Sequence, residues 1–314
     1  MTNQRTTIGW LQFTLLRGAP PTFRSLQGLF VAAILATGMA GCAASSNREP
    51  HQTPGPAGAL AATPLADDRI VVLAGADRKR ALYLLDVRND QVVRSFGVTA
   101  DASDVIAFDA NSVLLAVGKQ DSNRSVGALE RWDLGGKKLQ VLPMPSAVLG
   151  LTRAIDGVAY ALVGDGSSRA ALPITVPQMT LGTPVSLDSD ATSLSQCKIG
   201  SRDYLLYTHG DPGVVVVRDA DSGMTASSVA RVSKPTCLDG TSTIYGISRG
   251  FASRSIVELR IPTLERTAEV GASNDLSALY ASPDNHLVAL NATSRLSSVE
   301  KYVDESLADG TTSP

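Results

Sequence analysis

A pattern of apolar runs and short turns recurs at nearly constant spacing along most of this 314-residue chain. In each unit, the third apolar run ends in an apolar-polar-apolar step. The equivalent positions, spaced by 47, 42, 44, 42 and 41 residues, are Asp86, Asp133, Thr175, Asp219, Ile261 and Tyr302. A fixed period of this length is typical of architectures in which one small unit repeats.

The apolar runs predict β-strands, because they are short, rich in aliphatic and β-branched residues, and bounded by turn residues. The clearest are residues 69–75, 81–87 and 91–97. Helical periodicity is absent outside the N-terminal region. Because a four-stranded propeller blade takes about 40 to 50 residues, the sequence predicts an all-β propeller of six blades with four antiparallel strands each. A seven-bladed or irregular propeller is the alternative.

The last repeat has only three strands of its own, so closing the ring requires a strand from another part of the chain. The candidates are residues 58–67 and the tail after Val303. Four aspartates occupy the tight turns within the units, and we interpret them as turn residues rather than as a ring of catalytic acids. They are Asp109, Asp156, Asp239 and Asp284.

The N-terminal region has the layout of a secretory signal. Arg24 precedes an uncharged apolar segment at residues 28–39, which is shorter than the roughly 20 residues that a membrane span requires. The segment ends in Met39-Ala40-Gly41-Cys42, which resembles the lipobox of bacterial lipoproteins. This resemblance implies cleavage before Cys42, lipidation of its thiol, and an anchored location outside the cytoplasm in the bacterial cell envelope. The alternative is an uncleaved signal anchor, or secretory cleavage with Cys42 incidental.

These features divide the chain into four parts. Residues 1–41 are a signal peptide that is removed, 42–66 a flexible tether rich in Ala, Pro, Gly, Ser and Thr, 67–304 the propeller, and 305–314 a disordered tail. Residues 1–41 contain three arginines and no acid, so the rest has 25 basic and 30 acidic residues and a net charge of −5. A mildly acidic body without basic clusters argues against a nucleic-acid partner.

Two segments carry a resemblance to a repeat family. Residues 281–302 resemble the YVTN-type β-propeller repeat, with a Ser-Pro-Asp turn followed by an apolar strand and a hairpin, and residues 214–232 resemble the end of such a repeat. The resemblance, which extends to WD40-like propellers, implies a fold and not an activity.

Cys197 and Cys237 fall at matching places in adjacent units, because each is followed by a glycine three residues later and then by a tyrosine. An even pair outside the cytoplasm favours a disulfide. A disulfide requires Cα atoms within about 7 Å, and neighbouring inner strands can lie farther apart. Two buried free thiols are therefore the alternative.

Asp104, Asp190 and Asp275 each lie next to the start of an innermost strand. In a propeller they would share one face near the channel mouth, where they are weak candidates for a metal site; the alternative is that they are solubilising loop residues. His209 and His286 lack the sequence context of a nucleophile and are expected to be exposed loop residues. No cofactor is predicted.

These observations favour a binding or scaffold module over an enzyme. We expect a membrane-anchored lipoprotein whose propeller binds an envelope protein or a cell-wall ligand. One alternative is a lactonase-type hydrolase with a metal at the channel mouth, by analogy with propellers that resemble this repeat. Another is a sensor subunit that works with a neighbouring membrane complex.

Overall fold

The computed structural model describes residues 52–55, 58–75, 79–89, 91–121, 124–164, 167–249, 254–272, 274, 276–283, 287–292 and 297–301. The predicted signal peptide, Cys42 and the predicted tail at 305–314 lie outside these residues. Every element within the described ranges is a β-strand. None of the described residues forms a helix with the length and apolarity to cross a lipid bilayer.

The first two blades are four-stranded antiparallel meanders in chain order. Blade 1 consists of β2 (Ala59–Pro64), β3 (Arg69–Ala74), β4 (Arg80–Asp86) and β5 (Gln91–Val98). Blade 2 consists of β6 (Ala102–Asp109), β7 (Ser112–Asp121), β8 (Arg124–Asp133) and β9 (Lys138–Met144). In both blades the second strand is buried along its centre, whereas the last strand is largely exposed.

Blade 3 has a divided outer strand. Its inner strands are β10 (Ala147–Leu151), β11 (Val158–Gly164) and β12 (Arg169–Thr175). Two short strands, β13 (Thr180–Leu181) and β14 (Val185–Leu187), both pair with β12. Pro173 and Pro177 flank the end of β12, and the outer edge is therefore interrupted where the chain turns back.

The next two blades share one long strand. The sheet runs through β15 (Ala191–Ile199), β16 (Arg202–Gly210), β17 (Gly213–Asp219), β18 (Thr225–Cys237), β19 (Thr243–Arg249), β20 (Arg254–Arg260) and β21 (Glu265–Ala272). The first part of β18 pairs with β17, and its last part pairs with β19. Thus β18 is the outermost strand of blade 4 and the innermost strand of blade 5.

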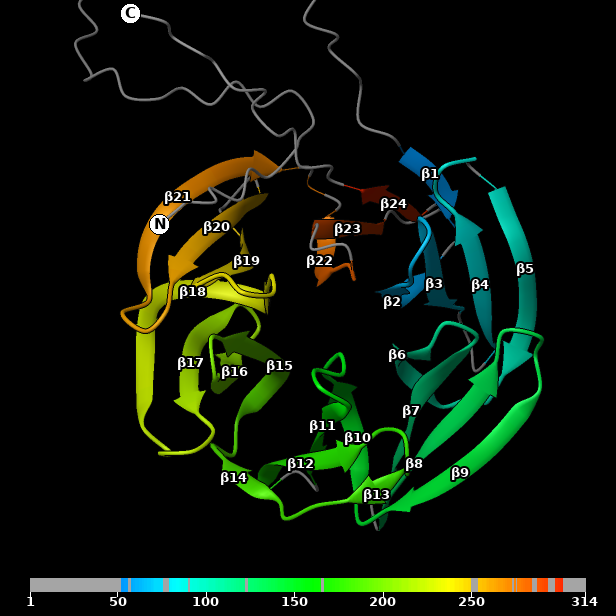
Figure 1. Cartoon of the computed structure of the whole chain (residues 1–314), viewed down its shortest axis with the longest axis horizontal. Coiled ribbons are helices and arrows are strands. Elements are labelled where there is room, and N and C mark those ends of the chain that lie inside the picture. Colours follow the sequence, from blue (N-terminus) through cyan, green and yellow to red (C-terminus); the bar gives the residue numbers. More distant parts are fainter. Residues whose placement is uncertain are drawn as a thin grey trace, which may run out of the picture.

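Blade 6 closes the ring by combining three strands near the end of the chain with one strand near its beginning. It contains β22 (Leu276–Ala281), β23 (Leu287–Ala292) and β24 (Ser297–Lys301), and β1 (Gln52–Gly55) pairs antiparallel with β24. Contacts between neighbouring blades lead from β2 through β6, β10, β15, β18 and β22 back to β2, so these strands surround the centre (Figure 1). The predicted all-β propeller fold is confirmed, and dividing the long sheet at β18 groups the described strands into six blades.

The closing strand is not one of the two that the sequence predicted. Residues 58–67 instead contain the innermost strand β2, and β1 closes the ring from within the segment expected to be a tether. The tether prediction is therefore wrong for Gln52–Gly55 and Ala59–Pro64. Residues of β2 suit an innermost strand, because the small side chains of Ala61 and Ala62 are almost fully buried. The closing strand β1 needs no apolar side chains, because an outermost strand is held by backbone hydrogen bonds to the edge of the sheet.

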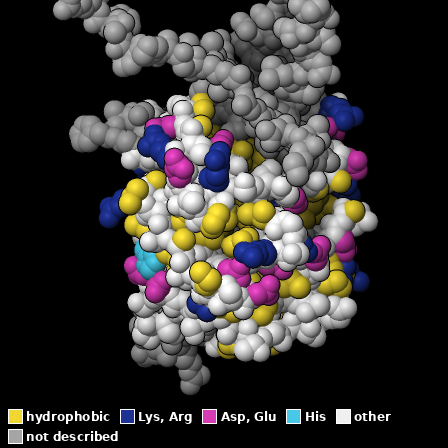
Figure 2. Space-filling view, turned by 60° about the vertical axis from the view of Figure 1, so that its left-hand side comes forward, with side chains coloured by type: hydrophobic (Ala, Val, Ile, Leu, Met, Phe, Trp, Pro, Cys, Tyr) yellow, Lys and Arg dark blue, Asp and Glu magenta, His cyan; other side chains and the backbone are white. Residues whose placement is uncertain are grey.

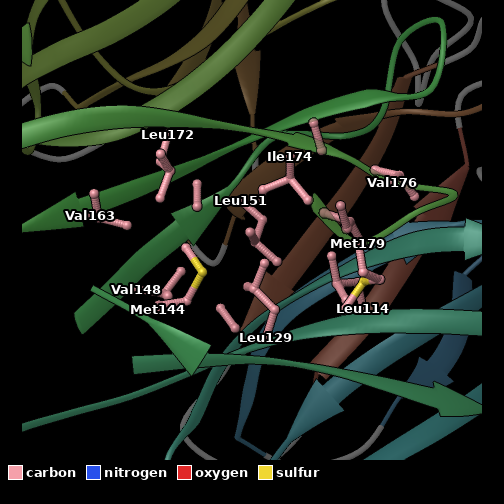
Figure 3. Packing of buried hydrophobic residues seen from close by; sticks show 14 residues of the cluster. Leu114, Leu129, Met144, Val148, Leu151, Val163, Leu172, Ile174, Val176 and Met179 are labelled. Atoms are coloured by element: carbon pink, nitrogen blue, oxygen red, sulfur yellow. The ribbon is translucent and has the colours of Figure 1, made fainter. Parts of the chain in front are cut away.

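The hydrophobic core lies between the faces of neighbouring blades. Leu114, Leu129 and Met144 of blade 2 pack with Val148, Leu151 and other residues of blade 3 (Figure 3). Alternate residues of each strand face the two neighbouring blades, so a strand such as β7 is buried on both sides. Each blade thus depends on both neighbours for its core, which holds the central strands in place.

Candidate functional site

A cavity of about 200 Å³ lies at the centre of the ring and is lined by residues of β2, β6, β10, β15, β18 and β22. Much of its wall is aliphatic, with leucines from several blades. Four lining residues are acidic, basic or phenolic: Asp104, Arg153, Lys234 and Tyr280. Arg153 forms an ion pair with Asp239, so the other three are considered below.

Asp104 lies in β6 and is held by two backbone amides. The amide of Val105 donates to Oδ1 at 2.8 Å, and the amide of Leu151 in β10 donates to Oδ2 at 2.8 Å. Burial raises the pKa of Asp104 above its ordinary value, although both amide hydrogen bonds and the positive charge of Lys234 oppose the shift. Asp104 therefore links blades 2 and 3 and places one carboxylate in the cavity.

Tyr280 lies in β22 and reaches across to blade 1. Its hydroxyl oxygen accepts a hydrogen bond of 3.0 Å from the amide of Ala62. Burial, followed by the charge of Asp104, raises the pKa of Tyr280. The phenol is therefore protonated at neutral pH and keeps a hydrogen that it can donate.

Lys234 lies in β18, where this strand passes from blade 4 to blade 5. Its backbone is in the left-handed region, with φ of 46°, and the register with β19 shifts between Ser233 and Thr236. The residue is exposed at the cavity lining. Among the described residues, no hydrogen bond or ion pair engages its ammonium group.

The other polar groups around the cavity hold strands together. Thr63 Oγ1 accepts from the amide of Ala107 at 3.0 Å, and Gln196 Nε2 donates to the carbonyl of Val158 at 2.8 Å. Ser195 Oγ donates to the carbonyl of Pro235. These groups have partners in neighbouring blades, so they position the wall rather than offer free ligand contacts.

Asp190 belongs to a different cluster from Asp104. His209 Nδ1 lies 2.6 Å from Asp190 Oδ1, and His209 Nε2 lies 3.1 Å from Asp188 Oδ2. Tyr207 donates a hydrogen bond of 2.9 Å to Asp188 Oδ2. Figure 2 shows acidic side chains beside the histidine. The prediction of an exposed loop histidine is wrong for His209, because this residue lies in β16. Its ring lies between the carboxylates of Asp188 and Asp190, in the segment that precedes β15.

The three aspartates proposed as a metal site do not form a common site in the described part of the chain. Asp104 lines the cavity, whereas Asp190 does not and shares no hydrogen-bond partner with it. Asp275 and His286 lie outside the described residues. Within the described ranges, no group of three His, Cys, Asp or Glu side chains is placed to hold a metal ion.

Cys197 and Cys237 are joined by a disulfide in the structure, with their Cα atoms 5.9 Å apart. They lie in β15 and at the end of β18, the innermost strands of blades 4 and 5, and each is about 1% exposed. The neighbouring residues Gln196 and Thr236 line the cavity. The disulfide therefore ties two strands of the cavity wall to each other.

Sequence reasoning identified Asp104 but missed Lys234 and Tyr280. A usable signal existed for Lys234, because it is a lone charged residue between Ser233 and Pro235, just before the predicted innermost strand of its unit. Tyr280 has no such signal, since an aromatic residue in a strand is ordinary core composition. Its role depends on which face of β22 points to the cavity.

Comparisons with known proteins show the fold. No protein-family model and no curated protein matches the sequence. Hydrazine synthase of Kuenenia stuttgartiensis is similar in structure, with a TM-score of 0.57, 12% identity, and coverage of 79% of this chain and 84% of that chain. A glucose dehydrogenase has a TM-score of 0.54 and 11% identity, with coverage of 79% of this chain and 97% of that chain. The WD40 repeats of RRP9 have a TM-score of 0.51 and 12% identity, with coverage of 77% of this chain and 80% of that chain. At such low identity these likenesses show the β-propeller fold alone.

Proposed function

We propose that this protein is an extracytoplasmic, lipid-anchored propeller that serves as a binding module for another protein of the cell envelope. The lipobox-like sequence at Cys42 supports the anchor. The propeller fold supports a binding role, because it presents many loops and strand edges on a rigid frame. The observation that carries the proposal is a set of exposed apolar side chains on the outer strands of two adjacent blades.

We call this set the outer apolar rim, which consists of Val92, Val93, Leu139 and Val141. Their exposed fractions are 51%, 56%, 45% and 49%. Val92 and Val93 lie in β5, whereas Leu139 and Val141 lie in β9. Exposed apolar side chains on outer strands are candidates for contact with a protein partner.

The two strands of the outer apolar rim belong to blades that are joined near it. The rings of Phe96 in β5 and Trp132 in β8 stack with centroids 6.3 Å apart. Arg94 Nη1 also donates to the carbonyl of Leu134, in the turn before β9. These contacts hold the outer strands in one arrangement, so a partner would meet a preformed surface rather than a mobile one.

The alternative hydrolase has no specific observation in its favour. Its metal site was assigned to Asp104, Asp190 and Asp275, and the structure places the first two in separate surroundings. The likeness to a glucose dehydrogenase concerns the fold. We therefore propose no second function.

The anchor is tested by labelling growing cells with radioactive palmitate. We expect the wild-type protein to incorporate label and to fractionate with membranes, and Cys42→Ala to do neither. Cys237→Ala is the matched control, because its thiol lies in the propeller, and it should still be labelled. Equal labelling of wild type and Cys42→Ala would refute the anchor.

The rim is tested by crosslinking in intact cells, with the partner identified by mass spectrometry. We expect one envelope protein to be crosslinked to the wild type and to be lost in the double variant Val93→Lys/Val141→Lys. Val229→Lys is the matched control, because Val229 is fully exposed on β18, in a different blade. Unchanged crosslinking in the double variant, or equal loss in the control, would count against the rim as the interface.

A further inference from the structure

We propose that the central cavity binds a small zwitterion, a molecule that carries both a primary ammonium group and a carboxylate, of the size of a short amino acid. Asp104 would hold the ammonium group, Lys234 the carboxylate, and Tyr280 would donate a hydrogen bond to an oxygen of the ligand. This proposal is independent of the lipid anchor and of the protein partner.

The ammonium end is assigned from the surroundings of Asp104. Each of its carboxylate oxygens accepts one backbone amide, at 2.8 Å in both cases. A carboxylate has about four acceptor positions, so about two remain. Within the described residues no cationic side chain forms an ion pair with it, and burial disfavours its charge, as the raised pKa of Asp104 reflects. A ligand ammonium group would supply the missing counter-charge and donors.

The carboxylate end is assigned from Lys234. Its ammonium group has no hydrogen-bond or ion-pair partner among the described side chains, and its positive charge opposes the upward shift in the pKa of Asp104. Its left-handed backbone, with φ of 46°, is uncommon for a residue with a side chain, and such conformations concentrate at ligand-binding positions. The bulge between Ser233 and Thr236 also re-aims side chains relative to a regular strand.

The size and walls of the cavity narrow the ligand further. The volume of about 200 Å³ is below the range of roughly 300 to 1,000 Å³ that drug-sized ligands occupy. The leucines of the wall, Leu60, Leu149, Leu194 and Leu279, suit a short aliphatic part. A ligand with only one charge would pair with only one of Asp104 and Lys234, whereas a zwitterion would pair with both.

The test is isothermal titration calorimetry on the full chain purified in detergent, with four probes at equal ionic strength. Glycine, alanine and 4-aminobutyrate vary the separation of the two charges, and propionate lacks the ammonium group. We expect at least one zwitterion to bind at least 10-fold more tightly than propionate. No binding by any of the three zwitterions, or equal binding of propionate, would overturn the proposal.

Substitutions test which residue binds each charged end of the ligand. Lys234→Gln and Asp104→Asn should each weaken binding of the preferred zwitterion at least 10-fold, whereas Lys137→Gln, an exposed lysine in the turn before β9, should not change it. Undiminished binding in Lys234→Gln would overturn the assignment. Should Asp104→Asn fail to fold, as judged by thermal melting, the pH dependence replaces it: binding must weaken as the pH falls through the raised pKa of Asp104. Binding that stays constant there would refute the role of this carboxylate.

Discussion

Two junctions between neighbouring blades are built in contrasting ways. Next to the junction of blades 1 and 2, Glu130 of β8, about 5% exposed, accepts hydrogen bonds from Lys138 Nζ at 2.6 Å and Trp132 Nε1 at 2.9 Å within blade 2. It also accepts one at 2.6 Å from Thr99 Oγ1, in the connection from blade 1. Between blades 4 and 5, the chain itself is continuous through β18, and the disulfide from Cys197 to Cys237 joins the two inner strands. The first junction is a hydrogen bond from the connection to an ion-paired carboxylate inside blade 2, and the second is covalent.

The difference shows that a closed ring does not require one kind of junction. Each blade packs apolar faces against both neighbours, so the core supplies the common contribution. The additional contacts then determine which conditions weaken each junction. Acid should act on the first junction through Glu130, whereas a reducing agent should act on the second.

The largest effect is expected from removing the disulfide. The double variant Cys197→Ala/Cys237→Ala should lose about 4 kcal/mol of unfolding free energy, because the bond closes a segment of 40 residues in the unfolded chain. Urea denaturation measures the loss. Dithiothreitol should destabilise the wild type and leave the double variant unchanged. Equal sensitivity of both proteins to the reductant would show that the pair is not bonded in solution.

Replacing Glu130 should have the next largest effect. Glu130→Ala should cost about 2 to 3 kcal/mol, because the indole N–H of Trp132 loses its acceptor and Lys138 loses its counter-ion. Lys138→Ala should cost only about 1 kcal/mol, since the lysine side chain is 38% exposed and solvent screens its charge. Urea denaturation at pH 7 compares the two variants. A larger loss in Lys138→Ala than in Glu130→Ala would contradict this assignment.

The same carboxylate gives the first junction its pH dependence. Burial alone would raise the pKa of Glu130, but hydrogen bonds from Lys138, Thr99 and Trp132 outweigh it and lower the pKa below the ordinary value of 4.5. The stabilisation is therefore present above about pH 4.5 and is lost as the pH falls through the lowered pKa. The stability difference between wild type and Glu130→Ala should shrink over that interval and remain constant above it.

A glycine at the second junction should give a smaller effect. A Cβ atom added to Gly246 in β19 would lie 2.7 Å from Cγ2 of Val232 in β18. Gly246→Ala should therefore destabilise the protein by about 1 to 3 kcal/mol through overpacking. Gly271→Ala is the matched control, because nothing lies within 4 Å of its added Cβ, and its thermal midpoint should not fall. A similar decrease in both variants would mean that glycine itself, rather than the contact, is responsible.

Much of the fold could be predicted, because turn residues recur at a regular spacing along the sequence. Spacings of 41 to 47 residues and turns such as Asp156-Gly157 and Asp239-Gly240 predict four-stranded units, and both glycines have positive φ. The closing strand could not be predicted. Gln52–Gly55 has no apolar side chain that marks a strand, and it pairs with a segment more than 240 residues away.

The site was less accessible to sequence reasoning than the fold. The position of Asp104 beside an innermost strand follows from the repeat, and the structure places it in the cavity. Its partners depend on the register of three further blades, which bring Leu151, Lys234 and Tyr280 around it. A change of one residue in register would turn each side chain to the opposite face of its sheet. Repeat spacing does not fix the register this closely.

The smallest effect at neutral pH is expected at a third junction, between blades 3 and 4, where Tyr207 donates a hydrogen bond to Asp188. Burial, followed by this hydrogen bond and the negative charge of Asp188, raises the pKa of Tyr207 to about 12. Tyr207→Phe should cost about 1 to 2 kcal/mol at pH 7, because one hydrogen bond to a charged group is lost. In a titration of tyrosinate absorbance, subtracting the variant from the wild type should leave one transition near pH 12.

The sign of this pH dependence is opposite to that of Glu130. Because the folded pKa of Tyr207 lies above its ordinary value of 10.0, its contribution is complete below about pH 10 and is lost as the pH rises toward 12. Asp188→Asn should move the transition to lower pH, since it removes the charge that opposes ionisation. A difference transition near pH 10 in the wild type would mean that Tyr207 is neither buried nor paired as the structure places it. A junction of this third kind would then be absent, leaving only the two kinds described at the other junctions.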